Sequence, residues 1–153
     1  MEMRKKFLRS LPYLKDMSTQ IIMQIIFKLR EHTYEKDTYI LRRGDMSEKV
    51  YIVWMGEVAV EVQKKSQENL PRINIGGNQR RSSFQRTHET YLNFDVLKRG
   101  SCFSAYAPFA NDGELAQLVN FRVSSPKCVL LEVSNKQLMK IGKSHLDLTF
   151  RLK

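Results

Sequence analysis

Two segments of the chain follow a period of two: Val50, Ile52 and Trp54 alternate with Tyr51 and Val53, and valine recurs at every second position from Val58 to Val62. Such alternation is typical of β-strands that bury one face. The tripeptide Met55-Gly56-Glu57 interrupts the pattern, and glycine at this place favours a turn. We therefore expect a β-hairpin with one buried face, within a small β-roll.

Helical periodicity marks the start of the chain. Apolar residues in segment 3–15 recur at spacings of three and four, with Pro12 as an interruption, which predicts a short helix followed by a turn. Asp16 or Ser18 can cap a firmer helix. Its apolar face consists of Ile21, Ile22, Ile25, Ile26 and Leu29. We expect this helix to end near Glu31, with His32 as a helix-end residue.

The later part of the chain favours further strands and a final helix. Segment 32–42 predicts strand structure on both sides of the polar turn Glu35-Lys36-Asp37. Further strands are expected at 93–97, 118–124 and 127–133, and Ser134 can cap a last helix. The expected fold class is α+β: an antiparallel, jelly-roll-like β-roll flanked by N-terminal and C-terminal helices.

Segment 64–92 has no apolar periodicity. It contains Pro71, the pair Gly76-Gly77 and six Lys or Arg residues, which predicts a flexible basic insertion. The expected organisation is a lead-in helical segment, 1–17, and one domain, 18–153, that carries the insertion at about 64–92. Apolar residues continue up to Lys153, so we expect the sequence to be a piece of a longer protein.

Composition limits the cellular location and the kinds of partner that we expect. No apolar run approaches the roughly 20 residues that a bilayer requires, and no signal peptide is visible. Two isolated cysteines, Cys102 and Cys128, argue against a disulfide framework or a zinc site and fit a cytoplasmic location. The net charge of +10 favours an anionic partner: a nucleotide, an anionic membrane surface, an acidic protein or nucleic acid.

One stretch of the chain carries a family resemblance. A strand ending in Arg42-Arg43-Gly44-Asp45, a loop, an aromatic-rich strand, a glycine and a valine strand together resemble the cyclic nucleotide-binding domain family. The resemblance covers about 10–142. It implies a regulatory, non-catalytic module with cAMP or cGMP as ligand and no cofactor. It further implies other domains or subunits of a parent protein as partners, with the cytoplasmic tail of a cation channel favoured.

The same resemblance implies a phosphate-binding cassette, in which helix N-terminal amides and an arginine hold the cyclic phosphate and a glutamate holds the ribose. Alignment on segment 100–103 places Ser104 and Ala105 at the family's Gly-Glu positions. The candidate ligand residues are then Phe103, Ser104, Ala105, Tyr106, Ala107, Gln117, Leu118 and Val119. In this favoured register the glutamate and the arginine are both missing, which predicts weakened binding or a ligand-free docking and assembly module.

A rival register starts later in the chain. The run Gly113, Glu114, Leu115 and Ala116 matches the family motif residue for residue, and Arg122 follows at nearly the expected distance. This register leaves few residues for the strands that follow the arginine in the family. A functional Glu114 and Arg122 would indicate a ligand sensor.

The insertion contains a kinase-like sequence. Segment 80–84 reads Arg-Arg-Ser-Ser-Phe and resembles the preferred site of basic-directed kinases, with Ser83 as the acceptor. Phosphorylation there would add nearly two negative charges beside a basic cluster. A regulatory subunit of a kinase is accordingly a further alternative function.

No catalytic constellation is visible. His32, His88 and His145 are far apart, and none lies in a nucleophile or metal-binding motif. No P-loop and no RNA-binding signature occurs, so we expect neither an enzyme, nor a metal site, nor a nucleic-acid-binding protein.

Overall fold

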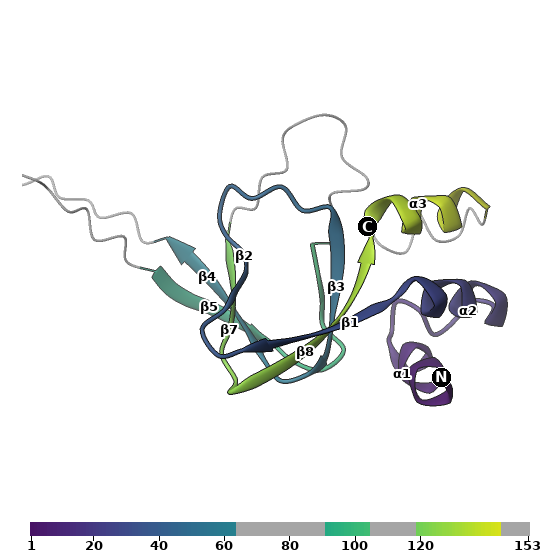
Figure 1. Ribbon diagram of the computed structural model, residues 1–153, viewed down its shortest axis with the longest axis horizontal. Helices are drawn as coiled ribbons and strands as arrows, with labels where there is room; N and C mark the ends of the chain where they lie inside the picture. The colour runs from purple at the N-terminus through teal and green to yellow at the C-terminus, as the bar shows by residue number, and fades with distance from the viewer. Residues whose placement is uncertain (64–90, 105–118, 145–153) are drawn as a thin grey trace, which may run out of the picture.

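The computed structural model describes residues 1–63, 91–104 and 119–144. The helices are α1 (Glu2–Ser10), α2 (Thr19–Lys28) and α3 (Asn135–Ser144). The strands are β1 (Arg30–Glu35), β2 (Tyr39–Leu41), β3 (Lys49–Met55), β4 (Val58–Gln63), β5 (Tyr91–Leu97), β6 (Cys102–Phe103), β7 (Asn120–Val123) and β8 (Lys127–Ser134). They form two antiparallel four-stranded sheets that face each other as a roll, with the helices at one end (Figure 1). The predicted α+β roll is confirmed.

The two sheets divide the strands in an order that the sequence did not predict. The first sheet has the order β1-β8-β3-β6, and the second has the order β2-β7-β4-β5. Strands β3 and β4 therefore do not pair with each other, and the expected hairpin is wrong. The chain instead passes from the first sheet to the second at Gly56, where φ is +89°. A Cβ atom there would lie 2.5 Å from the Lys127 carbonyl oxygen, so the crossing requires glycine.

Strand β3 buries both of its faces, which corrects the expected single buried face. Val50 and Ile52 lie in a core between the first sheet and the helices. Tyr51 and Val53 lie in the core inside the roll. A central strand covered on both sides is apolar at consecutive positions, and its alternation does not reveal which face is covered.

The helices pack on the face of the first sheet that points away from the roll interior, and they share a single core with it (Figure 1). The predicted lead-in segment contributes Phe7, Leu8, Leu11, Leu14 and Met17 to this core. The predicted apolar face of α2 is confirmed, since all five of its residues are buried. Ser18 is the cap: its hydroxyl accepts a hydrogen bond from the Ile21 amide at 3.3 Å. From α3, Leu138 and Ile141 complete the layer.

Helix α2 ends at Lys28, three residues earlier than predicted. The backbone of Leu29 is extended, and β1 starts at Arg30 and pairs with β8. His32 therefore lies in a strand and not at a helix end. The helix stops because β1 completes the ladder with β8, a non-local contact that outweighs local helix propensity. The expected turn between β1 and β2 is present, with Asp37 at φ 66°.

Strand β5 starts at Tyr91, two residues before the predicted strand, because Tyr91 and Leu92 pair with Gln63 and Val62 of β4. The β4–β5 ribbon projects from the roll (Figure 1). The rest of the predicted insertion, including Ser83, lies outside the described residues. In the parts of the chain that are described, no helix is long and apolar enough to cross a membrane.

Candidate functional site

An aromatic stack links the two sheets inside the roll. The ring of Phe103, on β6, stacks on Tyr51 of β3 with centroids 5.0 Å apart and an interplanar angle of 12°. On its other side it stacks on Phe121 of β7 at 4.5 Å and 20°. All three side chains are buried. The stack fixes the end of β6, which is the point where the predicted cassette begins.

Ser104 follows the stack in an unusual backbone conformation. Its φ is 65°, in the left-handed region that non-glycine residues rarely occupy, and it is buried. Steric repulsion of the Cβ atom makes this conformation about 1–2 kcal/mol less favourable for an L-residue than for glycine. The residue at 104 therefore has a glycine-like backbone. Its position coincides with the glycine of the cassette in the favoured register.

Arg122, the arginine of the rival register, lies on the outer face of the second sheet. Its neighbours Phe121 and Val123 both point into the roll, so the side chain between them points away. Its Nε donates to Glu61 Oε1 and its terminal nitrogen donates to Asp37 Oδ1, both at 2.6 Å. The hydrogen bond with Glu61 raises the pKa of the guanidinium further above its ordinary value. Arg122 thus ties β4 and the β1–β2 turn to β7.

A second buried carboxylate, Glu132 on β8, lies on the face of the first sheet that lines the roll. It is 3% exposed and accepts hydrogen bonds from the Tyr34 hydroxyl at 2.5 Å and from Lys49 Nζ at 2.8 Å. His32 Nε2 lies 3.9 Å from it. Burial, followed by the bond to Glu132, raises the pKa of Tyr34. The same carboxylate raises the pKa of Lys49 through its hydrogen bond. The interior therefore holds a fixed, paired negative charge.

Comparison with solved structures identifies the fold, whereas no model of a protein family matches the chain. The regulatory domain of Toxoplasma gondii PKA, crystallised with cAMP, matches with a TM-score of 0.69 and 18% identity over 98% of this chain and 48% of that one. The sensor domain of the transcriptional regulator DNR from Pseudomonas aeruginosa matches with a TM-score of 0.71 and 14% identity, over 99% and 87%. The chain has the cyclic nucleotide-binding fold.

A third match is a regulatory subunit of a cAMP-independent protein kinase A from Trypanosoma brucei, as a mutant bound to cAMP in the A site. Its TM-score is 0.68, with 17% identity over 98% of this chain and 46% of that one. The present chain thus spans about half the length of these two PKA proteins and nearly all of the DNR sensor domain.

Part of the predicted site lies within the described residues of this cyclic nucleotide-binding fold. Phe103 and Ser104 stand at the end of β6. Val119 is half-buried just before β7, packed against the roll core that also contains Phe103. Arg122 lies on the outer sheet face. The remaining predicted ligand residues lie outside the described residues: Ala105, Tyr106, Ala107, Gly113, Glu114, Leu115, Ala116, Gln117 and Leu118.

Sequence reasoning missed Glu132 as a feature of the roll interior. The available signal was a lone carboxylate in the otherwise apolar run from Cys128 to Val133. Its partners on β1 and β3 are distant in sequence and gave no local pattern. Within 1–63, 91–104 and 119–144, no cluster of three or more His, Cys, Asp or Glu side chains could hold a metal ion.

Proposed function

We propose that this chain is a regulatory module in which a cyclic nucleotide occupies the inside of the roll and its binding is transmitted to a neighbouring effector. The observation that carries this proposal is the glycine-like backbone of Ser104 at the end of β6, the place where the family's cassette begins. The cAMP-bound structures that share the fold support the ligand class.

The geometry favours a cassette that starts at Ser104 over one that uses Arg122. To bind a phosphate inside the roll, Arg122 would have to leave Glu61 and Asp37 and turn to the other face of its sheet. That would leave Glu61, which is 5% exposed, without its strongest partner. Removing one member of a buried ion pair costs about 3–5 kcal/mol. A phosphate is therefore expected to meet the backbone amides and hydroxyl of segment 104–107.

The core offers a physical connection from this segment to the helices. Phe103 stacks on Tyr51, whose neighbours Val50 and Ile52 pack under α2 and α3 on the opposite face of β3. A ligand that draws Phe103 and Ser104 toward itself would act on β3 and, through it, on the helical layer. Switching of this kind requires that the ligand bind the two arrangements of the helices with different affinities.

Calorimetric titration of the chain with cAMP and with cGMP tests the proposal. We expect binding in the range of about 0.1–1 mM, because the glutamate and arginine contacts of the family are missing. The double variant Ala105→Glu/Gln117→Arg should bind cAMP at least about 100-fold more tightly, since each restored charge-assisted hydrogen bond contributes roughly 1.5–3 kcal/mol. Glu114→Gln and Arg122→Lys are matched controls and should leave the affinity unchanged.

Each outcome assigns the site. Loss of binding in Glu114→Gln or Arg122→Lys, with an unaltered circular dichroism spectrum, would contradict the Ser104 cassette and favour the rival register. Absence of heat at millimolar nucleotide in both the native chain and the double variant would contradict nucleotide sensing altogether.

The second candidate function is a ligand-free docking and assembly module. It is favoured by the absence of both charged ligand residues in the preferred register, and one structure of the same fold is a regulatory subunit of a cAMP-independent protein kinase A. Two of the three solved structures above are PKA regulatory proteins, which supports a protein kinase as the effector. The cation channel expected from the sequence is the alternative effector. Pull-down of the full-length parent protein with candidate effectors would distinguish a protein kinase from a cation channel as the effector.

A further inference from the structure

A hollow of about 850 Å³ lies outside the roll, between α1 and the turn that joins β5 to β6. One wall is formed by α1 and the segment that follows it, with Lys6, Phe7 and Tyr13, and the other wall is formed by Trp54, Arg99 and Cys102. The volume falls within the range of about 300–1,000 Å³ that is typical of small-molecule sites. Trp54 and Phe7 face the helical layer, so this hollow is separate from the interior of the roll.

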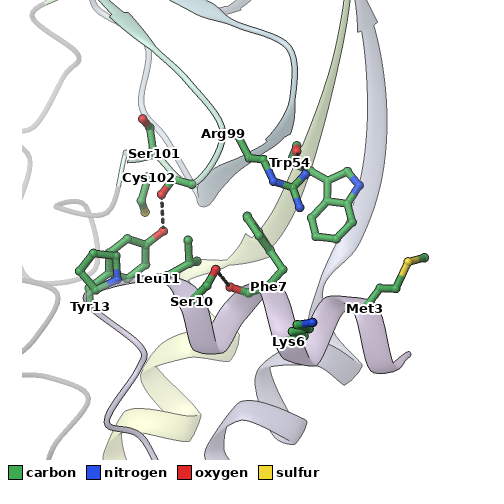
Figure 2. A pocket seen from close by; sticks show the side chains of 12 residues that line it. Met3, Lys6, Phe7, Ser10, Leu11, Tyr13, Trp54, Arg99, Ser101 and Cys102 are labelled. Carbon is green, nitrogen blue, oxygen red and sulfur yellow. Dashed lines mark hydrogen bonds between the residues drawn. The ribbon is translucent and has the colours of Figure 1, made fainter.

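Arg99 is held in place by two aromatic rings. Its guanidinium carbon lies 4.6 Å from the centroid of Phe7 and 4.5 Å from that of Trp54. The two rings meet edge to face, with centroids 4.5 Å apart. One terminal nitrogen of Arg99 donates to the Trp54 carbonyl oxygen at 2.5 Å. Figure 2 shows the guanidinium beside both rings at the wall of the hollow.

The charge of the lining is of one sign. Lys6 lies on the same face of α1 as Phe7 and Met3, and with Arg99 it gives the hollow two cations and no carboxylate. Within the described part of the chain no Asp or Glu forms an ion pair with either cation, whereas Arg4 of the same helix pairs with Glu31. A guanidinium has five N–H donors, so Arg99 keeps donors for an anion after its bond to Trp54.

The opposite side of the hollow is neutral. Tyr13 donates from its hydroxyl to the Gly100 carbonyl oxygen at 3.0 Å, and the exposed Pro12 adds apolar surface. Burial raises the pKa of the Cys102 thiol to about 12, so this sulfur stays protonated at neutral pH. The hollow thus combines a cationic side with an uncharged, largely apolar side.

We propose that this hollow is a second ligand site, for a small aromatic carboxylate. The carboxylate pairs with Arg99 and Lys6, and the ring packs on the accessible apolar surfaces of Met3, Pro12 and Trp54. The two cations select the anion, and the neutral side near Tyr13 and Cys102 selects an uncharged body. Because its walls join α1 to β3, a bound ligand stabilises the docking of α1 on the first sheet.

The test uses 3-phenylpropionate as the probe and its amide, 3-phenylpropionamide, as the uncharged control. Trp54 is the only tryptophan of the chain, so its fluorescence reports binding directly. We expect a saturable change of Trp54 emission with the carboxylate below about 10 mM. The amide, which lacks the charge, should bind at least tenfold more weakly.

Three variants assign the effect to the cations. Arg99→Gln and Lys6→Gln should each weaken the carboxylate by at least about tenfold, the loss of one charge-assisted hydrogen bond. Lys6 is exposed, so its variant does not disturb the core. Arg42→Gln is the matched control: Arg42 also stacks on an aromatic ring, Tyr39 at 4.3 Å, but lies outside the hollow. It should leave the affinity unchanged.

Several results would overturn the proposal: no saturable response of Trp54, equal affinity for the amide, or native affinity in both the Arg99 and the Lys6 variants. A calorimetric titration of the same samples with cAMP separates this site from the roll. If the native chain binds the carboxylate but not cAMP, the proposed function alone is rejected. If it binds cAMP but not the carboxylate, the second site alone is rejected.

Discussion

Two arginines, in two regions of the molecule, differ in what occupies their hydrogen-bond donors. On the outer face of the second sheet, Arg122 is bound by Glu61 and Asp37. In the turn before β6, Arg99 is held by the rings of Phe7 and Trp54 and, among the described residues, by no carboxylate. An arginine can therefore bind an anionic ligand only where its neighbours fix the orientation of the guanidinium without pairing it with a carboxylate.

The largest expected effect concerns the stability of the fold. Replacing Arg122 by Met leaves Glu61 buried, and among the described residues the Tyr39 hydroxyl, 3.3 Å away, is then its one hydrogen-bond partner. We expect Arg122→Met to lower the free energy of unfolding by about 3 kcal/mol, measured by urea denaturation. The double variant Arg122→Met/Glu61→Leu removes both charges and should recover most of the loss. A single variant as stable as the native chain would contradict a structural role for Arg122.

A second prediction concerns the backbone of Ser104, which distinguishes the two registers. A β-branched side chain is strongly disfavoured at φ 65°, so Ser104→Val should lower the free energy of unfolding by about 2 kcal/mol. Ser104→Gly should be tolerated, because glycine adopts this φ without strain and loses only its greater backbone entropy. Ser104→Ala reports the hydroxyl alone. Equal stability of the Val and Gly variants would remove the main support for a cassette that starts here.

A smaller effect is expected at the other arginine. Arg99→Met leaves no buried carboxylate behind and removes two cation–π contacts, so the cost should be about 1 kcal/mol in the same denaturation assay. The difference from Arg122→Met, about 2 kcal/mol, measures the asymmetry between the two regions. A loss at Arg99 as large as that at Arg122 would assign Arg99 to the structural frame and weaken the case for a ligand at the hollow.

The sequence predicted most of the fold because its local patterns have local causes. The Ser18 cap, the apolar face of α2 and the strands 127–133 and 58–62 follow from propensity and period. The assignment of β3 and β4 to different sheets was not predictable, because β3 is apolar on both faces. The local sequence around Gly56 is compatible both with a hairpin turn within one sheet and with a crossing from one sheet to the other.

The candidate site was predictable only in part, for a related reason. Alignment with the family placed Ser104 at a glycine position of the cassette, whereas its left-handed backbone is known only from the structure. The outward direction of Arg122 was accessible as well, since apolar Phe121 and Val123 flank it in a strand. Its partners Glu61 and Asp37 are 61 and 85 positions away in the chain, and such pairing leaves no local signal. The Trp54–Arg99 contact likewise joins residues 45 positions apart.

Arg122 and the group around Glu132 differ in their response to alkaline pH. Arg122 keeps its proton at any accessible pH, whereas the group around Glu132 contains Tyr34, whose pKa is raised above its ordinary 10.0 chiefly by burial. Because folded Tyr34 holds its proton to a higher pH than unfolded Tyr34, unfolding releases a proton above about pH 10 and stability falls as the pH rises. The burial of Tyr51 and Tyr13 acts in the same direction. Urea denaturation at about pH 8 and about pH 11 should therefore show a smaller alkaline loss for Tyr34→Phe than for the native chain. An unchanged loss would assign the alkaline sensitivity to the other groups whose pKa is raised in the folded chain: Tyr13, Tyr51, Lys49, Cys102 and Cys128.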